Sequence, residues 1–134
     1  MADDSALSLA RAHLVLLRSD AQLATIVLDR IFDYIPRSIP YPFVIYHITN
    51  GDEWDTTCDN GEEHTVFIHA YDDYEGPKRA RQVMRRVFEL IHDKTNLPLV
   101  DHNLVNCRRV FHTMDREEQL YHGVSRYRAI TEEL

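Results

Sequence analysis

The stretch EHTVFIHAY, residues 63–71, and the stretch GPKRARQVMRRVFELIH, residues 76–92, decide the fold of this chain. Residues of the first piece alternate between two faces, which is typical of a β-strand: Val66, Ile68 and Ala70 against Thr65, Phe67, His69 and Tyr71. In the second piece, apolar residues recur three and four positions apart, which is typical of an amphipathic helix. Pro77 suits a helix start, where its missing N–H costs nothing. A strand followed by a helix is therefore predicted.

Upstream, the sequence predicts two helices and one long strand. Apolar spacing indicates a helix over residues 5–18, and Ser19 with Gln22 reads as a capping box that opens a second helix over residues 20–28. A short extended piece at residues 31–35 ends at Pro36. Residues 41–49, YPFVIYHIT, are rich in β-branched and aromatic side chains and predict a strand, and the polar residues 50–62 predict a loop.

Downstream, residues 72–75 predict a second acidic loop, and two strands are expected over residues 104–114 and 120–131. The polar residues 115–119 are expected to form the turn between them. Helices gathered on one face of a mainly antiparallel sheet of four to five strands would bury every apolar stripe. The predicted class is therefore α+β, with residues 1–134 forming a single domain.

Composition narrows the class of protein. Of 134 residues, 44% are hydrophobic and 28% charged, which suits a soluble globular protein, and the net charge of −7 argues against a general nucleic-acid binder. The start lacks the features of a secretory signal, and the longest charge-free run, residues 38–51, is too short to cross a bilayer. We expect a cytoplasmic protein whose two cysteines, Cys58 and Cys107, are free thiols.

The eight histidines could contribute to a metal site or a catalytic site. His64 and His69 should point to opposite faces of their strand, and no HExxH, CxxC or His-x-His pattern is present, so strand-edge or subunit-contact histidines are the main interpretation. Asp101 and His102 precede a strand with Cys107, but no nucleophile elbow accompanies them. A small metal-dependent hydrolase using His47, His69 and nearby carboxylates remains the alternative; otherwise no catalytic residue, metal or cofactor is expected.

The helix over residues 76–92 has a basic side. A solvated charged face is its main interpretation, and contact with DNA is the alternative, although no aromatic residue interleaves with the cations Lys78, Arg79, Arg81, Arg85 and Arg86.

Charge is also distributed unevenly over the predicted strands and loops. A basic patch is expected on the last two strands, and two acidic loops each carry an aromatic residue. These candidate interface residues are Arg108, Arg126 and Arg128 in the patch, Asp52, Glu53 and Trp54 in one loop, and Asp72, Asp73 and Tyr74 in the other. Complementary patches favour head-to-tail contacts between copies, which close into rings. Pairing of the arginines within their own subunit is the equal alternative.

Several ordered motifs resemble one family. Arg30-Ile31-Phe32-Asp33 with Pro42-Phe43-Val44 is similar to an "R-[VI]-[FY]-D … P-[FY]-V" signature, and residues 61–71 resemble a "GEEHTLTLHVW" strand. The ending, residues 121–129, is similar to "HGVLRFRA". These motifs resemble the tail-completion proteins of siphophages, prophages and gene transfer agents. The resemblance covers residues 7–132, and the family tends to have a plainer loop where this chain has residues 52–60.

The resemblance implies a structural virion protein in the tail or neck, assembled in the host cytoplasm and without an enzymatic activity. It implies a homo-oligomeric ring, a hexamer, that caps the tail tube, ends polymerisation of the tail-tube protein and joins the tail to the head connector. DNA would pass through the lumen without specific binding, and no membrane would be involved. A connector or stopper subunit on the head side is the alternative structural role.

Overall fold

The computed structural model describes residues 4–53 and 61–134. The helices are α1 (Ser5–Arg18), α2 (Ala21–Val27) and α3 (Lys78–Ile91). The strands are β1 (Ile31–Phe32), β2 (Phe43–Glu53), β3 (Gly61–Asp72), β4 (His102–Glu117) and β5 (Leu120–Glu133).

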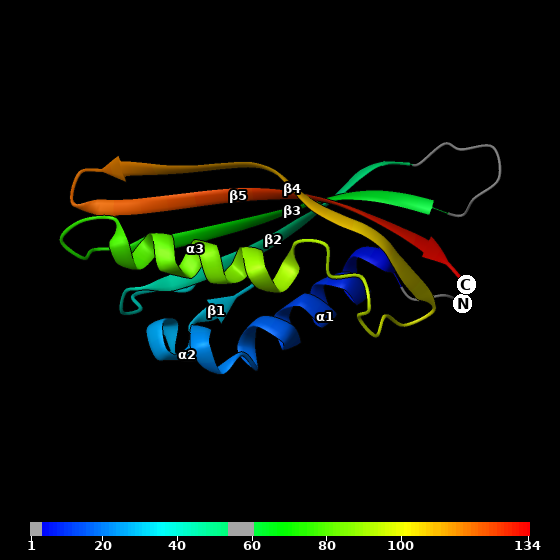
Figure 1. Cartoon of the computed structure of the whole chain (residues 1–134), viewed down its shortest axis with the longest axis horizontal. Helices are drawn as coiled ribbons and strands as arrows, with labels where there is room; N and C mark the ends of the chain where they lie inside the picture. Colours follow the sequence, from blue (N-terminus) through cyan, green and yellow to red (C-terminus); the bar gives the residue numbers. More distant parts are fainter. Residues whose placement is uncertain (1–3, 54–60) are drawn as a thin grey trace.

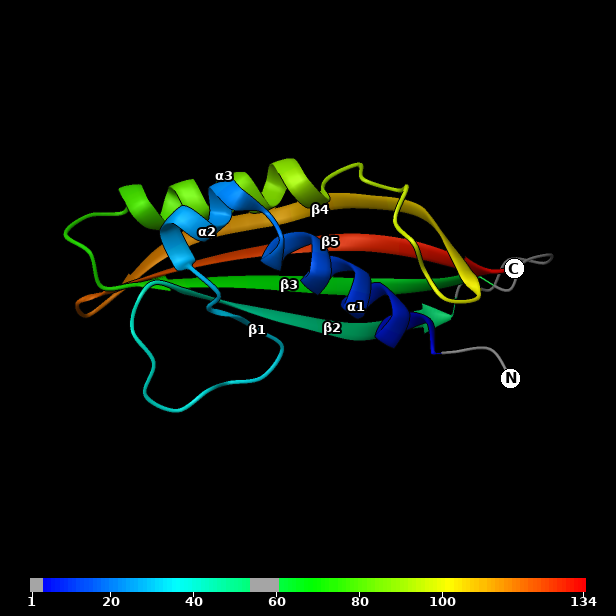
Figure 2. The same ribbon diagram turned by 90° about the horizontal axis from the view of Figure 1, so that it is seen from below.

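The strands form one five-stranded sheet in the order β1-β2-β3-β5-β4. The short β1 runs parallel to β2, and the other neighbours pair antiparallel. Figure 1 shows the sheet as the upper layer with the three helices beneath it, and the view from below in Figure 2 shows the helices in front of the sheet. The predicted α+β class, with helices on one face of a mainly antiparallel sheet, is confirmed.

The core lies between the helices and one face of the sheet. Both long helices turn their apolar side toward the strands, and β3 contributes every second residue, as its alternation predicts. Each large side chain buried here contributes about 1.5–3 kcal/mol. Fully buried members include Leu9 and Leu17 of α1, Val83, Val87 and Ile91 of α3, and Val66, Ile68 and Tyr127 of the sheet.

Gly123 of β5 lies where α3 approaches the sheet. A Cβ atom at this position would lie 2.9 Å from Cε of Met114 and 3.0 Å from Cγ of Met84. The missing side chain therefore leaves room for two methionines, whose flexible side chains fill the space between helix and sheet.

Two aspartates begin the first helices. Asp4 caps α1 by accepting hydrogen bonds from the backbone N–H groups of Ala6 and Leu7. Asp20 caps α2, and its Oδ2 lies 2.8 Å from the backbone nitrogen of Leu23. The expected capping box at Ser19 is wrong, because the Asp20 carboxylate takes that place and is also held by Arg86 of α3 at 2.6 and 2.9 Å.

Several strand ends extend beyond their predicted limits. β2 continues to Glu53, where the sequence indicated a loop, because it still pairs with β3 through Glu62. Asp72 ends β3 and does not lie in the acidic loop. β4 continues through Asp115 to Glu117, since Asp115 pairs with His122 and Arg116 with Tyr121. The turn shrinks to Glu118 and Gln119, with Glu118 at a φ of 57°, as a tight hairpin requires.

Polar groups are also buried beneath the sheet. His13 of α1 is fully buried, and its Nδ1 lies 2.7 Å from the hydroxyl oxygen of Tyr46. The buried His64 lies with Nε2 3.0 Å from the hydroxyl of Thr131 and 3.3 Å from that of Ser5. None of the three helices within residues 4–53 and 61–134 has the length and apolar character that crossing a lipid bilayer requires.

Candidate assembly surface

The face of the sheet opposite the helices carries rows of aromatic and imidazole rings. On β3 this face consists of Thr65, Phe67, His69 and Tyr71, as the alternation predicts. The strand register extends each position into a row. One row is Phe43, Tyr71, His122 and Asp115, the next is Ile45, His69, Val124 and Thr113, and the third is His47, Phe67, Arg126 and Phe111. We call these three rows the open face.

Rings of the first row stack on one another. The centroids of Tyr71 and His122 are 4.3 Å apart, and those of Phe43 and Tyr71 are 5.2 Å apart. Tyr41, from the chain before β2, continues the stack on Phe43 at 5.4 Å. Stacked rings lose little side-chain freedom when a second surface covers them, so they make an ordered contact area.

Two histidines link the first row to the second. His69 Nδ1 lies 2.9 Å from His122 Nε2, and His122 Nδ1 lies 3.2 Å from a carboxylate oxygen of Glu117. Burial lowers the pKa of His69, and His122 and His47 lower it further by charge repulsion. A neutral His69 is therefore favoured at neutral pH.

A hollow of about 590 Å³ borders the open face. Tyr34 and Ile35, from the segment before β2, line this hollow together with the stacked rings of Phe43 and Tyr71. Tyr34 and Ile35 are strongly exposed, at 59% and 86%. The hollow is therefore an apolar edge of the open face that a partner could fill.

The three arginines of the predicted basic patch share one face. Arg108 pairs in register with Arg128, and Arg126 alternates with the buried Ser125 and Tyr127. Two of them are already neutralised within the chain, since Arg108 bonds Asp93 at 3.0 Å and Arg128 bonds Glu63 at 2.5 Å. Pairing within the subunit, kept open from the sequence, holds for these two residues.

Arg126 differs from its two neighbours. Its guanidinium lies 4.7 Å from the ring centre of Phe111, with which it pairs on the open face. Phe111 itself is 42% exposed on the edge strand. Arg126 and Phe111 together thus form a cation–π unit at the edge of the open face.

The predicted acidic loops have different surroundings. Asp72 is fully buried and accepts two hydrogen bonds from Arg79, at 2.6 and 2.9 Å, so it serves the fold of its own chain. Asp73 and Tyr74 are exposed, and the Arg79 guanidinium lies 4.9 Å from the Tyr74 ring centre. The backbone of Asp52 and Glu53 belongs to β2, whereas their side chains and the whole of Trp54 lie outside the described residues.

The metal alternative required histidines that converge. His64 and His69 point to opposite faces, as predicted, because His64 is buried and His69 lies on the open face. His47 and His69 lie in adjacent rows, and the Phe67 ring contacts both, with centroid distances of 5.9 Å to His47 and 6.3 Å to His69. In the parts of the chain that the structure covers, no three potential ligands gather around one point.

The sequence pattern of the family described as "Tail completion protein gp17" matches residues 11–132. The chain belongs to this tail-completion family. Its members are structural proteins of the phage tail, and the family is not one of enzymes.

A solved structure shares the fold over almost the whole chain. It is part of the "Virion of native gene transfer agent (GTA) particle", with a TM-score of 0.85 and 24% identity, covering 96% of this chain and 97% of the other. A comparison with curated proteins gave no match.

The motifs of this tail-completion protein were visible in the sequence, but the ring stack was not. Phe67, His69 and Tyr71 already alternate with core residues, so the non-core side of β3 was unusually rich in rings. The partners Phe43 and His122 come from strands whose register the sequence does not specify. That concentration of rings on an outward-facing strand side was the signal for an assembly surface.

Proposed function

We propose that this chain is a tail terminator. Copies join through the open face into a ring, a hexamer, that docks on the last ring of the tail tube, ends polymerisation of the tail-tube protein and presents a surface to the head connector. The protein is then located in the tail or neck of the virion, after assembly in the host cytoplasm.

The observation that carries this proposal is the open face in a member of the tail-completion family. The three helices of the described residues cover one side of the sheet (Figures 1 and 2). The strand register places the rings and Arg126 on the other side. Aromatic residues and arginine are enriched where proteins bind one another. A neighbouring copy would bury the stack and the hollow beside it.

The net charge supports passage of DNA through the ring. At −7 the subunit repels the phosphate backbone on average, which suits a channel through which DNA slides without being held. The candidate contacts Trp54, Asp52, Glu53, Asp73 and Tyr74 remain predictions for the surfaces toward tube, connector or neighbouring copy.

Replacing Phe111 by Glu tests the proposal. A carboxylate at this exposed edge position would be buried by assembly, so the variant should remain a folded monomer while the native protein forms a hexamer. The matched control is Val15→Glu, at a 66% exposed position of α1 on the helix side. Light scattering gives the mass of each variant, and thermal unfolding verifies folding. If the Phe111→Glu variant were still a hexamer, the open face would not form the interface between copies.

Mixing with tail-tube protein separates the terminator from its alternative. Negative-stain images should show tubes that stop growing and carry a ring at one end. A protein that leaves tube growth unchanged and instead binds the head connector is the connector or stopper subunit. A chain that stays monomeric alone and with tubes contradicts both ring proposals.

A further inference from the structure

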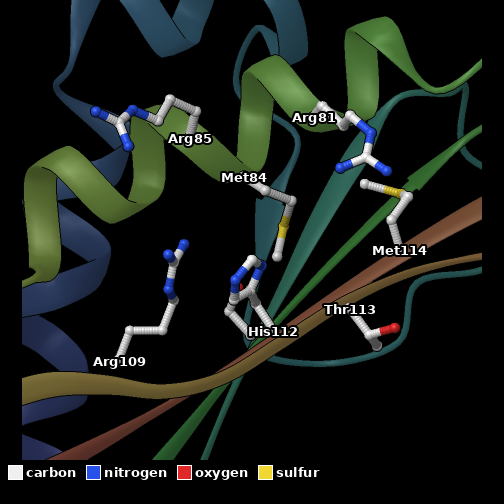
Figure 3. A pocket seen from close by; sticks show the side chains of 8 residues that line it. Arg81, Met84, Arg85, Arg109, His112, Thr113 and Met114 are labelled. Carbon is white, nitrogen blue, oxygen red and sulfur yellow. The ribbon is translucent and has the colours of Figure 1, made fainter.

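A second surface lies on the opposite side of the sheet from the open face. It is a groove of about 270 Å³ between α3 and the edge strand β4. Arg81 and Arg85 line it from α3, and Arg109 and His112 line it from β4, with Met84 and Met114 between them. Figure 3 shows the side chains of Arg81 and Arg109 on either side of Met84 and His112.

The positive charge of this groove is not neutralised by the residues that the structure describes. Within the described residues, Arg81 and Arg109 have no carboxylate partner, and Arg85 has only a distant one, Glu89 at 3.9 Å. The other arginines that flank α3 and β4 differ, since Arg79, Arg86, Arg108 and Arg128 each bond an aspartate or glutamate of the chain. Charge left unpaired in an acidic protein is available to an external anion.

Two further features prepare the groove for a ligand. The Arg109 guanidinium lies 4.0 Å from the ring centre of Phe88, which holds it in place before a ligand arrives. The Ser125 hydroxyl, which lies beside that of Tyr127, also lines the groove and adds a polar group to it.

The surroundings of the arginines indicate which anion fits. Guanidinium groups bind carboxylates and phosphates alike. The two methionines add an apolar surface that suits the methylene groups of an acidic side chain and not a phosphodiester. Among the strands that the structure describes, β4 pairs with β5 alone, so its outer edge can bond the backbone of an extended peptide.

We propose that this groove binds a glutamate- or aspartate-bearing segment of a partner protein, laid along β4 with its carboxylate between Arg81 and Arg109. The site goes beyond ring formation, because its arginines and methionines lie on the helix side and it shares with the open face Thr113 of the edge strand alone. It places the cationic contact surface on Arg81 and Arg109 and not on the paired Arg108 and Arg128.

Fluorescence anisotropy with a fluorescein-labelled peptide of six glutamates tests this site. The native protein should bind the peptide, and Arg81→Ala and Arg109→Ala should each weaken binding by about tenfold or more, because a charge-assisted bond is lost. Arg37→Ala is the matched control, since Arg37 is an exposed arginine outside the groove, and it should bind as the native protein does. Thermal unfolding verifies that all variants are folded.

Three outcomes would overturn the proposal. In the first, the peptide binds equally well to the native protein and to both groove variants. In the second, Arg37→Ala weakens binding as much as the groove variants do, which would indicate attraction by net charge alone. In the third, a 12-base-pair DNA duplex binds more tightly than the peptide and loses affinity in the same variants, which would make the groove a phosphate site. Because the peptide assay does not need a ring, its failure is distinguishable from failure of the terminator proposal.

Discussion

His13 couples the stability of the fold to pH at the scale of a single residue. Burial lowers its pKa from 6.5 to about 3, so the folded protein holds the imidazole neutral over this interval. The unfolded chain binds a proton below pH 6.5, whereas the folded chain does not until about pH 3. The stabilisation is therefore complete above pH 6.5 and decreases as the pH falls.

We expect the free energy of unfolding to fall by about 1.4 kcal/mol per pH unit below 6.5 from this residue alone. Urea unfolding at pH 7, 6 and 5 measures the slope. His13→Gln keeps a group that can bond the Tyr46 hydroxyl but removes the titration. The slope of its free energy of unfolding against pH should therefore be smaller by the contribution of one proton. Burial also lowers the pKa values of His64 and His69, which contribute to the slope that remains. Identical slopes in the native protein and His13→Gln would show that another group is responsible.

At the scale of elements, the pair of Asp72 and Arg79 joins the end of β3 to the first turn of α3. Arg79→Ala would leave the buried Asp72 carboxylate without its partner, so we expect a loss of about 3–5 kcal/mol in the free energy of unfolding. Arg81→Ala, two positions along the same helix, removes an exposed side chain and should change stability by less than about 0.5 kcal/mol. Urea unfolding compares the two. Equal losses would mean that helix propensity and not the ion pair controls the effect.

The periodicity of apolar residues predicted which segments are helices and which are strands, whereas the length of each strand depended on the strand with which it pairs. The predicted helix over residues 5–18 agrees with α1, and the alternation over residues 63–71 agrees with the burial of β3. The strand ends at Glu53 and Asp115 were hidden because polar residues interrupt the apolar alternation there, so the sequence indicates a loop or turn. Only pairing with Glu62 and His122 shows that these residues are strands.

The candidate assembly surface was predictable to the same degree. Arg108, Arg126 and Arg128 share a face, as strand alternation suggested. The neutralisation of Arg108 was not predictable, because its partner Asp93 lies in the loop after α3, and sequence spacing does not place that loop beside β4. The groove that contains Arg81 and Arg109 could not be predicted from the sequence for the same reason. It forms because α3 lies along the edge strand.

At the scale of the whole molecule, a ring built on the open face should respond to acid. Burial already lowers the pKa of His69 in the single subunit, and a neighbouring copy would exclude more water from it. The separated subunit therefore binds a proton more readily than the assembled one, so assembly strengthens as pH rises and weakens as pH falls. Each linked proton changes the dissociation constant between neighbours by at most about tenfold per pH unit.

Sedimentation at pH 7.5, 6.75 and 6 measures that dissociation constant, and circular dichroism verifies that the subunits stay folded. The native ring should loosen toward pH 6, whereas His69→Gln, which cannot gain the charge, should show a flatter dependence. His112→Gln is the matched control, because His112 lines the groove on the helix side of β4. It should keep the native dependence. If His69→Gln loosened as steeply as the native protein, the neighbouring copy would not cover the open face, and the ring would have to close through the edges of the sheet.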